Sequence, residues 1–364
     1  MKVLVLDATR PHLNPNPEIV HSITEAFRRI GQPHNVTYAT QWDFESLAAS
    51  RQPELILAIA GQICGELAAP LAAVRARQET TVGWWLTDDP YEIDGNLPRA
   101  RLFDFVATND LCSAGRYSGT SVLHVPLAAD RRRHFREVRR ADNDYQWDLV
   151  FCGVAFPNRL AWIQVAAPVL ARYKTLVLGP GWPSLRFTSS RRISNADLTD
   201  LYNSSRIVMN LPRSFNISNQ YGFPASTPAP RTFEAAAAGG FQLVSADRPE
   251  FHRHFDIPAE MDLFLNVQDL QAKIKRYLDS PGERIEAALH AQRRVLESHL
   301  YEHRAAAILD HVQQLRASSP GGTAPPLSRK PFGGRLKTSR TPAKLNFVML
   351  PSGVQVAATR VSSS

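Results

Sequence analysis

The stretch Arg231-Thr-Phe-Glu-Ala-Ala-Ala-Ala-Gly-Gly240, followed by Phe241-Gln-Leu-Val-Ser245, decides the fold of this chain. Its alanine-rich part favours a helix, and the two glycines allow that helix to end in a left-handed cap. Pro228 and Pro230 keep the loop before the helix extended. The residues after the glycines read as a buried strand. A helix placed between an extended loop and a strand is typical of a ligand-binding corner in an α/β domain.

The start of this helix offers chemistry that suits a sugar nucleotide. Free N–H groups and partial positive charge at a helix N-terminus attract a diphosphate. Glu234, in the first turn, remains free to accept hydrogen bonds from ribose hydroxyls. The alternative is a packing helix in which Arg231 and Glu234 merely pair with each other, three positions apart.

The composition is that of an ordinary globular protein. The chain has 364 residues, of which 44% are hydrophobic and 21% charged, and this length predicts about two folded domains. Residues 1–7 already read as a strand, and no apolar run reaches the roughly 18 residues of a membrane helix. We therefore expect a soluble, cytoplasmic protein. Cys64, Cys112 and Cys152 have no paired spacing, so we expect neither a disulfide framework nor a metal site.

Positive charge is concentrated at the C-terminal end. The net charge is +8, and residues 317–364 hold seven basic residues and no acid, which leaves the rest of the chain near neutrality. This tail is rich in Ser, Pro and Gly, so we expect a disordered basic extension that could bind an acidic partner. A second basic run, at residues 131–140, falls where we place the domain linker.

Strand and helix patterns alternate along the chain and restart after the basic run, which predicts an α/β protein with two doubly wound, Rossmann-like domains. We expect a first domain at residues 1–130, a linker at 131–147, and a second domain at 148–316 that ends in a long helical stretch at 282–316. The strands expected in the first domain are residues 2–7, 35–39, 54–60, 81–86, 103–108 and 121–125. Those expected in the second are residues 148–154, 174–178, 207–210, 241–245 and 263–267.

Ligands of open α/β sheets bind beyond the carboxyl ends of the strands. In the first domain Asp88 and Asp89 follow an apolar strand, and we expect one of these carboxylates to be catalytic. The alternative is an Asp cap before a proline turn. After the first strand, His12 and Asn14 lie in a long polar loop that could line an acceptor pocket or form only a surface turn.

In the second domain two glycine turns follow strands. Gly153 permits close backbone approach, and Asn158 and Arg159 lie at the start of the next helix. The segment Leu178-Gly-Pro-Gly-Trp182 offers a flat indole on which a nucleobase could stack. The sequence contains neither G-x-G-x-x-G nor G-K-[ST], which argues against a dinucleotide oxidoreductase and a P-loop enzyme.

Together these residues resemble the CgeB-type glycosyltransferases, which are related to the group-one transferases of GT-B fold. The segments that carry the resemblance are Trp84-Trp-Leu-Thr-Asp-Asp-Pro-Tyr91, Leu123-His-Val-Pro-Leu-Ala-Ala-Asp130, Asp148-Leu-Val-Phe-Cys-Gly153 with Asn158-Arg159, Ile207-Val-Met-Asn210, residues 231–240, and His299-Leu-Tyr-Glu-His-Arg-Ala305. The resemblance implies two facing domains, a nucleoside-diphosphate sugar bound by the second, ribose held by Glu234, and the diphosphate held near Arg231 and Thr232. The donor-binding residues are then Gly153, Asn158, Arg159, Gly179, Gly181, Trp182, Asn210, Arg231, Thr232 and Glu234.

One position departs from the family pattern. Group-one transferases usually carry a second glutamate in the loop before the helix, where this chain has Thr227. Arg213, Asn219 or Ser226 could supply the missing contact to the sugar.

The expected activity is therefore transfer of a sugar from a nucleoside diphosphate to an unknown acceptor, without metal or cofactor. Asp88 or Asp89 would orient or deprotonate the acceptor. Three alternatives remain open at this point: a non-catalytic surface or spore-associated scaffold of the same fold, a nucleic-acid base glycosyltransferase that holds phosphates with its basic tail, and a two-domain solute-binding protein.

Overall fold

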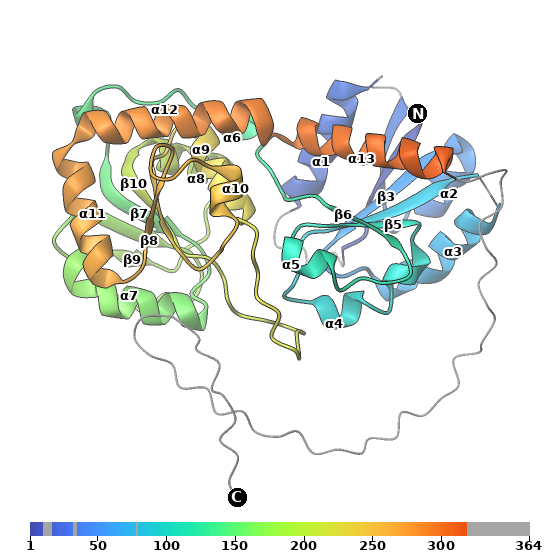
Figure 1. Ribbon diagram of the computed structural model, residues 1–364, viewed down its shortest axis with the longest axis horizontal. Coiled ribbons are helices and arrows are strands. Elements are labelled where there is room, and N and C mark those ends of the chain that lie inside the picture. The colour runs from blue at the N-terminus through green and yellow to red at the C-terminus, as the bar shows by residue number, and fades with distance from the viewer. Residues whose placement is uncertain (10–16, 32–34, 78, 319–364) are drawn as a thin grey trace, which may run out of the picture.

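The computed structural model describes residues 1–9, 17–31, 35–77 and 79–318. Within these ranges the chain forms two α/β domains that lie side by side (Figure 1). The chain passes from the first domain to the second after residue 130 and returns near residue 300. His12 and Asn14, and the basic tail from residue 319 onward, lie outside the described residues.

The first domain contains a parallel sheet of strand order β2-β1-β3-β4-β5-β6. Its strands are β1 (Val3–Asp7), β2 (Val36–Thr40), β3 (Leu55–Ala60), β4 (Thr81–Leu86), β5 (Phe105–Thr108) and β6 (Ser121–His124). Its helices are α1 (Glu18–Ile30), α2 (Phe44–Arg51), α3 (Ala68–Arg77), α4 (Ile93–Asn96) and α5 (Leu111–Ala114), with short 3₁₀ turns at Gly65–Leu67 and Ala100–Leu102.

The second domain repeats this design with a parallel sheet of order β12-β11-β10-β7-β8-β9. Its strands are β7 (Trp147–Cys152), β8 (Thr175–Leu178), β9 (Thr188–Ser189), β10 (Ser205–Asn210), β11 (Gln242–Ser245) and β12 (Asp262–Phe264). The helices of this half are α6 (Arg131–His134), α7 (Pro157–Leu170), α8 (Asn195–Asn203), α9 (Pro230–Ala237), α10 (Phe251–His254), α11 (Val267–Asp279) and α12 (Pro281–Ser298), with a 3₁₀ turn at Asp142–Asp144.

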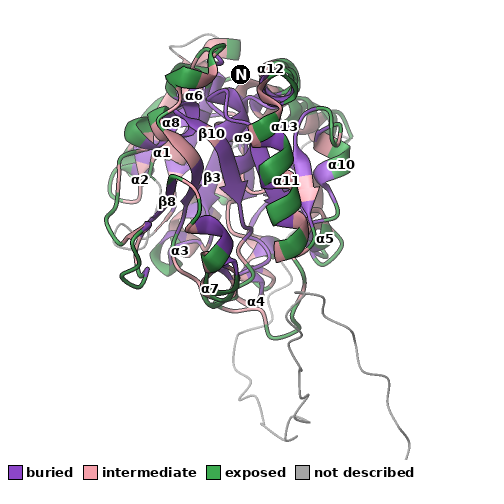
Figure 2. Ribbon diagram, turned by 90° about the vertical axis from the view of Figure 1, so that its left-hand side faces the viewer, coloured by how far each residue is buried: buried purple, intermediate pink, exposed green. Residues whose placement is uncertain are grey.

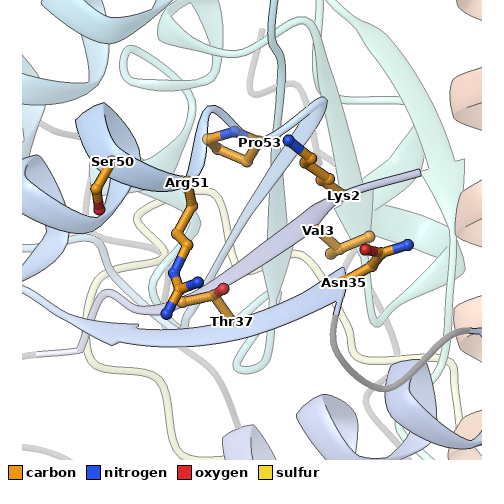
Figure 3. A pocket seen from close by; sticks show the side chains of 7 residues that line it. All are labelled: Lys2, Val3, Asn35, Thr37, Ser50, Arg51 and Pro53. Carbon is orange, nitrogen blue, oxygen red and sulfur yellow. The ribbon is translucent and has the colours of Figure 1, made fainter.

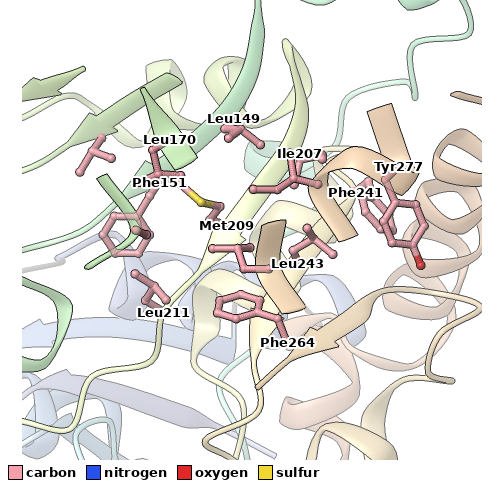
Figure 4. Packing of buried hydrophobic residues seen from close by; sticks show 14 of the residues in the cluster. Leu149, Phe151, Leu170, Ile207, Met209, Leu211, Phe241, Leu243, Phe264 and Tyr277 are labelled. Atoms are coloured by element: carbon pink, nitrogen blue, oxygen red, sulfur yellow. The ribbon is translucent and has the colours of Figure 1, made fainter. Parts of the chain in front are cut away.

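Burial on both faces explains why the strands read as continuous apolar runs. Every residue of β3, Leu-Ile-Leu-Ala-Ile-Ala, is buried, as expected for a parallel sheet covered by helices on both sides. Figure 2 shows the buried strands inside a layer of half-buried and exposed helices. In the second domain Leu149, Ile207 and Leu243 come from neighbouring strands and pack in one cluster with Tyr277 of α11 (Figure 4).

The expected alternation of strands and helices is present in both halves. All the strands predicted from the sequence are present, within a few residues of their expected ends. The short edge strand β9 was not predicted, because two residues carry no periodic pattern. The expected two-domain α/β fold is confirmed.

The last helix corrects the predicted domain limits. The helical stretch expected at 282–316 is broken at His299 and Leu300, and α13 (Tyr301–Ala317) packs on the first domain rather than the second. Figure 1 shows α13 beside α1. Its residues Ile308 and Val312 are completely buried in the core that also contains β1 and β3. The error arose because the periodicity of a helix shows that it has an apolar face but does not show against which of the two sheets that face packs.

The segment expected to be a linker, residues 131–147, packs on the second domain instead. Val138 is buried within the second domain's core, and the Arg136 N–H donates to the Ala237 carbonyl at 3.4 Å. One of its basic side chains, that of Arg136, also pairs with Asp200 at 2.7 Å.

Candidate active site

The candidate site lies where the carboxyl ends of the two sheets approach each other. Asp88 follows β4 of the first domain, and Arg213 follows β10 of the second. Their side chains meet with 3.4 Å between Arg213 Nη1 and Asp88 Oδ1. This contact brings the strand ends of both domains into one region, where open α/β sheets bind their ligands.

Four arginines, which we call the arginine cluster, converge on this region: Arg159, Arg213, Arg231 and Arg248. Burial, together with the positive charges of Arg231, Arg248 and Arg213, lowers the pKa of Arg159 to about 9. Arg159 therefore stays charged at neutral pH, although it feels the other three guanidinium groups. Such an accumulation of like charge is unfavourable unless an anion compensates it.

Within the described part of the chain, only Arg213 of this cluster forms an ion pair with a carboxylate. The other three donate to uncharged oxygens. Arg159 donates to the Leu211 and Val154 carbonyls, Arg231 to the Cys152 carbonyl, and Arg248 to the Thr227 carbonyl and the Tyr91 hydroxyl. These contacts fix the guanidinium groups in place without neutralising them.

Several donors of the site lack a partner. Among the described residues, Arg231 Nε, Arg213 Nη2 and the Tyr202 hydroxyl are buried without a hydrogen bond. A buried polar group without a partner costs about 1–3 kcal/mol. Guanidinium groups suit phosphate oxygens, because their planar N–H groups match an oxyanion in pairs. The arginine cluster therefore has the charge and the free donors of a diphosphate site.

Asp88 is the aspartate that faces this region. It keeps 34% of its side chain exposed and contacts Arg213. Desolvation by the surrounding protein raises the pKa of Asp88, and the Arg213 charge partly opposes this. A Cβ on Gly61 would lie 2.7 Å from Asp88 Oδ2, so a glycine is needed there to leave room for the carboxylate.

Asp89 has a structural position instead. Its side chain is 1% exposed, and the carboxylate accepts hydrogen bonds from Tyr117 at 2.7 Å, Thr108 at 2.7 Å and Asn96 at 3.3 Å. These contacts join three segments of the first domain. Of the two adjacent aspartates, Asp88 is therefore the one whose carboxylate faces the candidate site.

The Asp89 network predicts a pH-dependent stability. Burial raises the pKa of Asp89 from 3.8 to about 6, although its hydrogen bonds oppose the shift. Between these values the folded protein holds the proton more tightly than the unfolded chain, so stability is lost as the pH rises. We expect the unfolding free energy of wild type, relative to Asp89→Asn, to fall by about 1–3 kcal/mol between about pH 4 and about pH 7. Urea titrations of both proteins measure this, and a constant difference would contradict the raised pKa.

The two glycine turns lie against each other at the ends of β7 and β8. Gly179 has φ of +134°, and a Cβ there would come within 2.3 Å of the Gly153 carbonyl oxygen; Gly181 has φ of +86°. Trp182 is not the open stacking surface expected from the sequence. It is 5% exposed, belongs to the core, and donates from Nε1 to the Gly153 carbonyl at 2.8 Å.

Three other side chains expected to bind the donor make hydrogen bonds to other protein groups instead. Asn210 donates to Thr232 Oγ1 at 2.9 Å and to Gln242 at 3.1 Å, so both Asn210 and Thr232 belong to a buried network. Asn158 donates to the Pro212 carbonyl at 2.9 Å, although its Oδ1 is buried without a partner. The contribution of Asn210 and Thr232 is therefore to fix β10 against α9.

Glu234 lies in the first turns of α9 and faces the other domain. It lines a small hollow together with Glu18 and Ser22 of α1, Asn195 of α8 and Tyr301 of α13. The helix thus presents Arg231 toward β7 and Glu234 toward the first domain. This orientation leaves the Glu234 carboxylate at the interface between the domains.

The loop before α9 holds the three polar residues expected to replace the missing glutamate, and they differ in whether their side chains are free to contact a sugar. Asn219 bonds Phe223 within its own loop, and Ser226 is buried against the first domain. Arg213 stacks on Tyr91 with 4.1 Å from its Cζ to the ring centroid and retains a free N–H group. Of the three residues proposed to replace the missing glutamate, only Arg213 therefore lies beside Asp88.

Sequence reasoning missed Tyr91 and Arg248. Arg248 is 6% exposed and follows β11. Its position after a predicted strand was the one feature of the sequence that could have indicated a role in the site. Tyr91 stood beside the two aspartates in the sequence, but its partner Arg248 lies 157 residues away.

A separate hollow of about 170 Å³ lies at the opposite edge of the first sheet (Figure 3). It is lined by Lys2, Val3, Asn35, Thr37, Ser50, Arg51 and Pro53. The lining comes from the beginnings of strands β1, β2 and β3 and from the end of α2, so this hollow is not part of the candidate site.

In the part of the chain that the structure describes, no helix is long and apolar enough to cross a membrane, and no three or more His, Cys, Asp or Glu side chains are grouped so as to hold a metal ion.

Known proteins resemble this chain in sequence and in fold. Residues 159–310 match the family model described as glycosyl transferase-like. The spore protein CgeB of Bacillus subtilis is 26% identical over 220 residues, which cover 56% of this chain and 66% of CgeB, just under two thirds of its length.

Solved structures resemble the whole described fold. HepE of Anabaena, in complex with UDP and glucose, has a TM-score of 0.56 at 13% identity and covers 86% of this chain and 100% of its own. A DNA-modifying β-glucosyltransferase, studied with and without UDP-glucose, has a TM-score of 0.59 at 9% identity with the same coverage. At these identities the likeness concerns the fold alone. The GT-B architecture and the resemblance to CgeB-type glycosyltransferases are confirmed.

Proposed function

We propose that this chain, a CgeB-like protein of glycosyltransferase fold, transfers a sugar from a nucleoside diphosphate to an acceptor hydroxyl or similar nucleophile. The observation that carries the proposal is the arginine cluster: four buried or half-buried guanidinium groups that, among the residues the structure describes, share one carboxylate partner. A diphosphate would supply the missing negative charge and accept from the free N–H groups of Arg231 and Arg213.

The proposed donor site uses the end of the second sheet and the start of α9. Arg231 and Arg159 flank Gly153 at the end of β7, so the diphosphate would lie across this turn. The N-terminus of α9 adds partial positive charge. Glu234 would hold the ribose hydroxyls. Trp182 would act beneath the site by supporting Gly153 rather than by stacking on the base.

In the proposed reaction the acceptor oxygen forms a bond to the anomeric carbon, and the bond from that carbon to the diphosphate oxygen breaks. The leaving diphosphate takes the electron pair, and the arginine cluster stabilises its charge. Asp88 would orient the acceptor or take its proton, and a raised pKa makes it a better base than an ordinary aspartate. We propose that the arginines make a metal ion unnecessary, which predicts unchanged turnover in excess EDTA.

The donor site predicts a loss of nucleotide affinity in Glu234→Ala. We expect UDP binding to weaken by about 1.5–3 kcal/mol, the range for a lost hydrogen bond to a charged group. The helix should stay intact because alanine favours it, and Glu234→Gln should be milder. Calorimetric titration measures the change, with Glu283→Ala in α12 as a remote carboxylate control. Unchanged affinity in Glu234→Ala would make α9 a packing helix.

A further inference from the structure

The loop between β10 and α9, residues 211–229, bridges the two domains, and we call it the bridging loop. Figure 1 shows it extending from the second domain toward α4 and α5 of the first. Near its middle the loop is hydrogen-bonded to the first domain: the Tyr91 carbonyl accepts from the Ile217 and Ser218 N–H groups at 2.9 and 2.8 Å. The Asp94 carboxylate accepts from the Gln220 N–H at 2.8 Å.

The end of the bridging loop nearest α9 is held by Asp110. This residue is completely buried and caps α5 by accepting from the Ser113 N–H at 3.3 Å. The same carboxylate accepts from the Ser226 N–H at 2.6 Å and the Thr227 N–H at 3.0 Å, both from the second domain. One buried charge therefore joins N–H groups of two domains.

The contact is reciprocal. The Leu111 N–H, at the start of α5, donates to Thr227 Oγ1 at 3.1 Å, and the Cys112 N–H donates to Ser226 Oγ at 3.2 Å. The Asp110 carboxylate thus accepts from three N–H groups, and the hydroxyls of Ser226 and Thr227 accept from two more. Hydrogen bonds to an ionised acceptor are stronger than neutral ones, so Asp110 is the strongest link between the bridging loop and the first domain.

We propose that Asp110 is a positioning residue that sets the donor-binding helix α9 against Asp88 of the other domain. Thr227 lies three residues before Pro230, where α9 begins, so a fixed Thr227 fixes the start of the helix that carries Arg231. Asp88 and Asp110 follow the neighbouring strands β4 and β5 of one rigid sheet. Asp110 then sets the distance between the Asp88 carboxylate and the sugar donor bound at α9. This inference rests on the proposed function.

Asp94 provides a matched control, because it also accepts a hydrogen bond from the bridging loop. Its partner, the Gln220 N–H, lies further from α9 along the chain than Ser226 and Thr227 do. The test compares Asp110→Asn with Asp94→Asn in the full chain. An asparagine at 110 nearly preserves the volume but has one acceptor oxygen and no charge, so it cannot serve both the Ser113 N–H on one side and the Ser226 and Thr227 N–H groups on the other.

Three readouts test the proposal. We expect hydrogen exchange of the peptide containing Ser226 and Thr227 to rise at least about tenfold in Asp110→Asn and to stay unchanged in Asp94→Asn. UDP affinity should stay within about twofold, while UDP release from UDP-glucose at saturating donor falls about tenfold. Thr227→Val, which removes the reciprocal contact from the other side, should give a smaller change of the same kind.

Unchanged exchange at Ser226 and Thr227 in Asp110→Asn would overturn the proposal. Normal turnover in Asp110→Asn, together with faster hydrogen exchange at Ser226 and Thr227, would also overturn the proposal. A loss of UDP affinity together with faster exchange throughout the second domain would show a purely structural role. If wild type binds no nucleoside diphosphate, the proposed function fails, and the exchange measurement still decides whether Asp110 holds the loop.

Discussion

Asp88→Asn should lower the rate of sugar transfer by about 10²–10⁴-fold, the range for a positioned group that assists proton transfer. The amide keeps the size of the side chain and its contact with Arg213, but it cannot take a proton from the acceptor. Nucleotide affinity should stay nearly unchanged, because the donor rests on the second domain. Turnover and UDP affinity are measured in the same preparation, so that a fall in turnover alone identifies a role in the reaction step.

Glu92→Gln serves as the control for Asp88→Asn. Burial raises the pKa of Glu92, and the nearby Asp88 charge raises it further, so Glu92→Gln changes the local charge without altering the carboxylate that faces the cleft. We expect at most a severalfold change in turnover. Near-normal turnover in Asp88→Asn would remove this aspartate from the mechanism.

Arg231→Met should weaken UDP binding by about 2–5 kcal/mol, the cost of truncating one partner of a buried, hydrogen-bonded charge pair. That range corresponds to about 30-fold to several-thousand-fold in affinity. Methionine keeps the length of the side chain and fills part of its volume. Among the described residues, Arg231 has one hydrogen bond, to the Cys152 carbonyl, and its buried Nε has no partner, so most of its donors are available to a ligand.

Arg276→Met controls for loss of a positive charge elsewhere on the domain. Arg276 lies on α11, half exposed, and pairs with Glu283. Its removal should leave UDP affinity unchanged. Equal losses in both variants would indicate general electrostatic attraction rather than a binding site.

Most of the fold could be predicted from the sequence because its parallel strands are buried on both faces. Strands such as β3 and β4 therefore appear as short apolar runs bounded by polar loops, and β4 was predicted with its bounds at Thr81 and Leu86. The place of α13 could not be predicted in this way. Its apolar face fits either sheet by periodicity, and only packing shows that Tyr301 and Ile308 complete the first core.

The site was predicted less completely than the fold. Asp88 was expected after a strand, and Arg159 and Arg231 at the starts of helices, and the structure has them there; the catalytic and donor-binding roles expected of them stay predictions. Trp182 was expected to be open and is buried, since the sequence does not show which side of a turn an indole covers. Tyr91 and Arg248 come from different domains and meet only in the folded protein, where Arg248 donates to the Tyr91 hydroxyl, so no local pattern could have paired them.

The central claim is that the arginine cluster binds a nucleoside diphosphate. Calorimetric titration of the full chain with UDP, GDP, ADP and CDP tests it most directly, with Arg231→Met and Arg276→Met alongside wild type. We expect at least one nucleotide to bind wild type and Arg276→Met with equal affinity and to lose at least about 30-fold in Arg231→Met. Absence of binding to wild type by all four nucleotides, or equal binding to wild type and Arg231→Met, would contradict the claim.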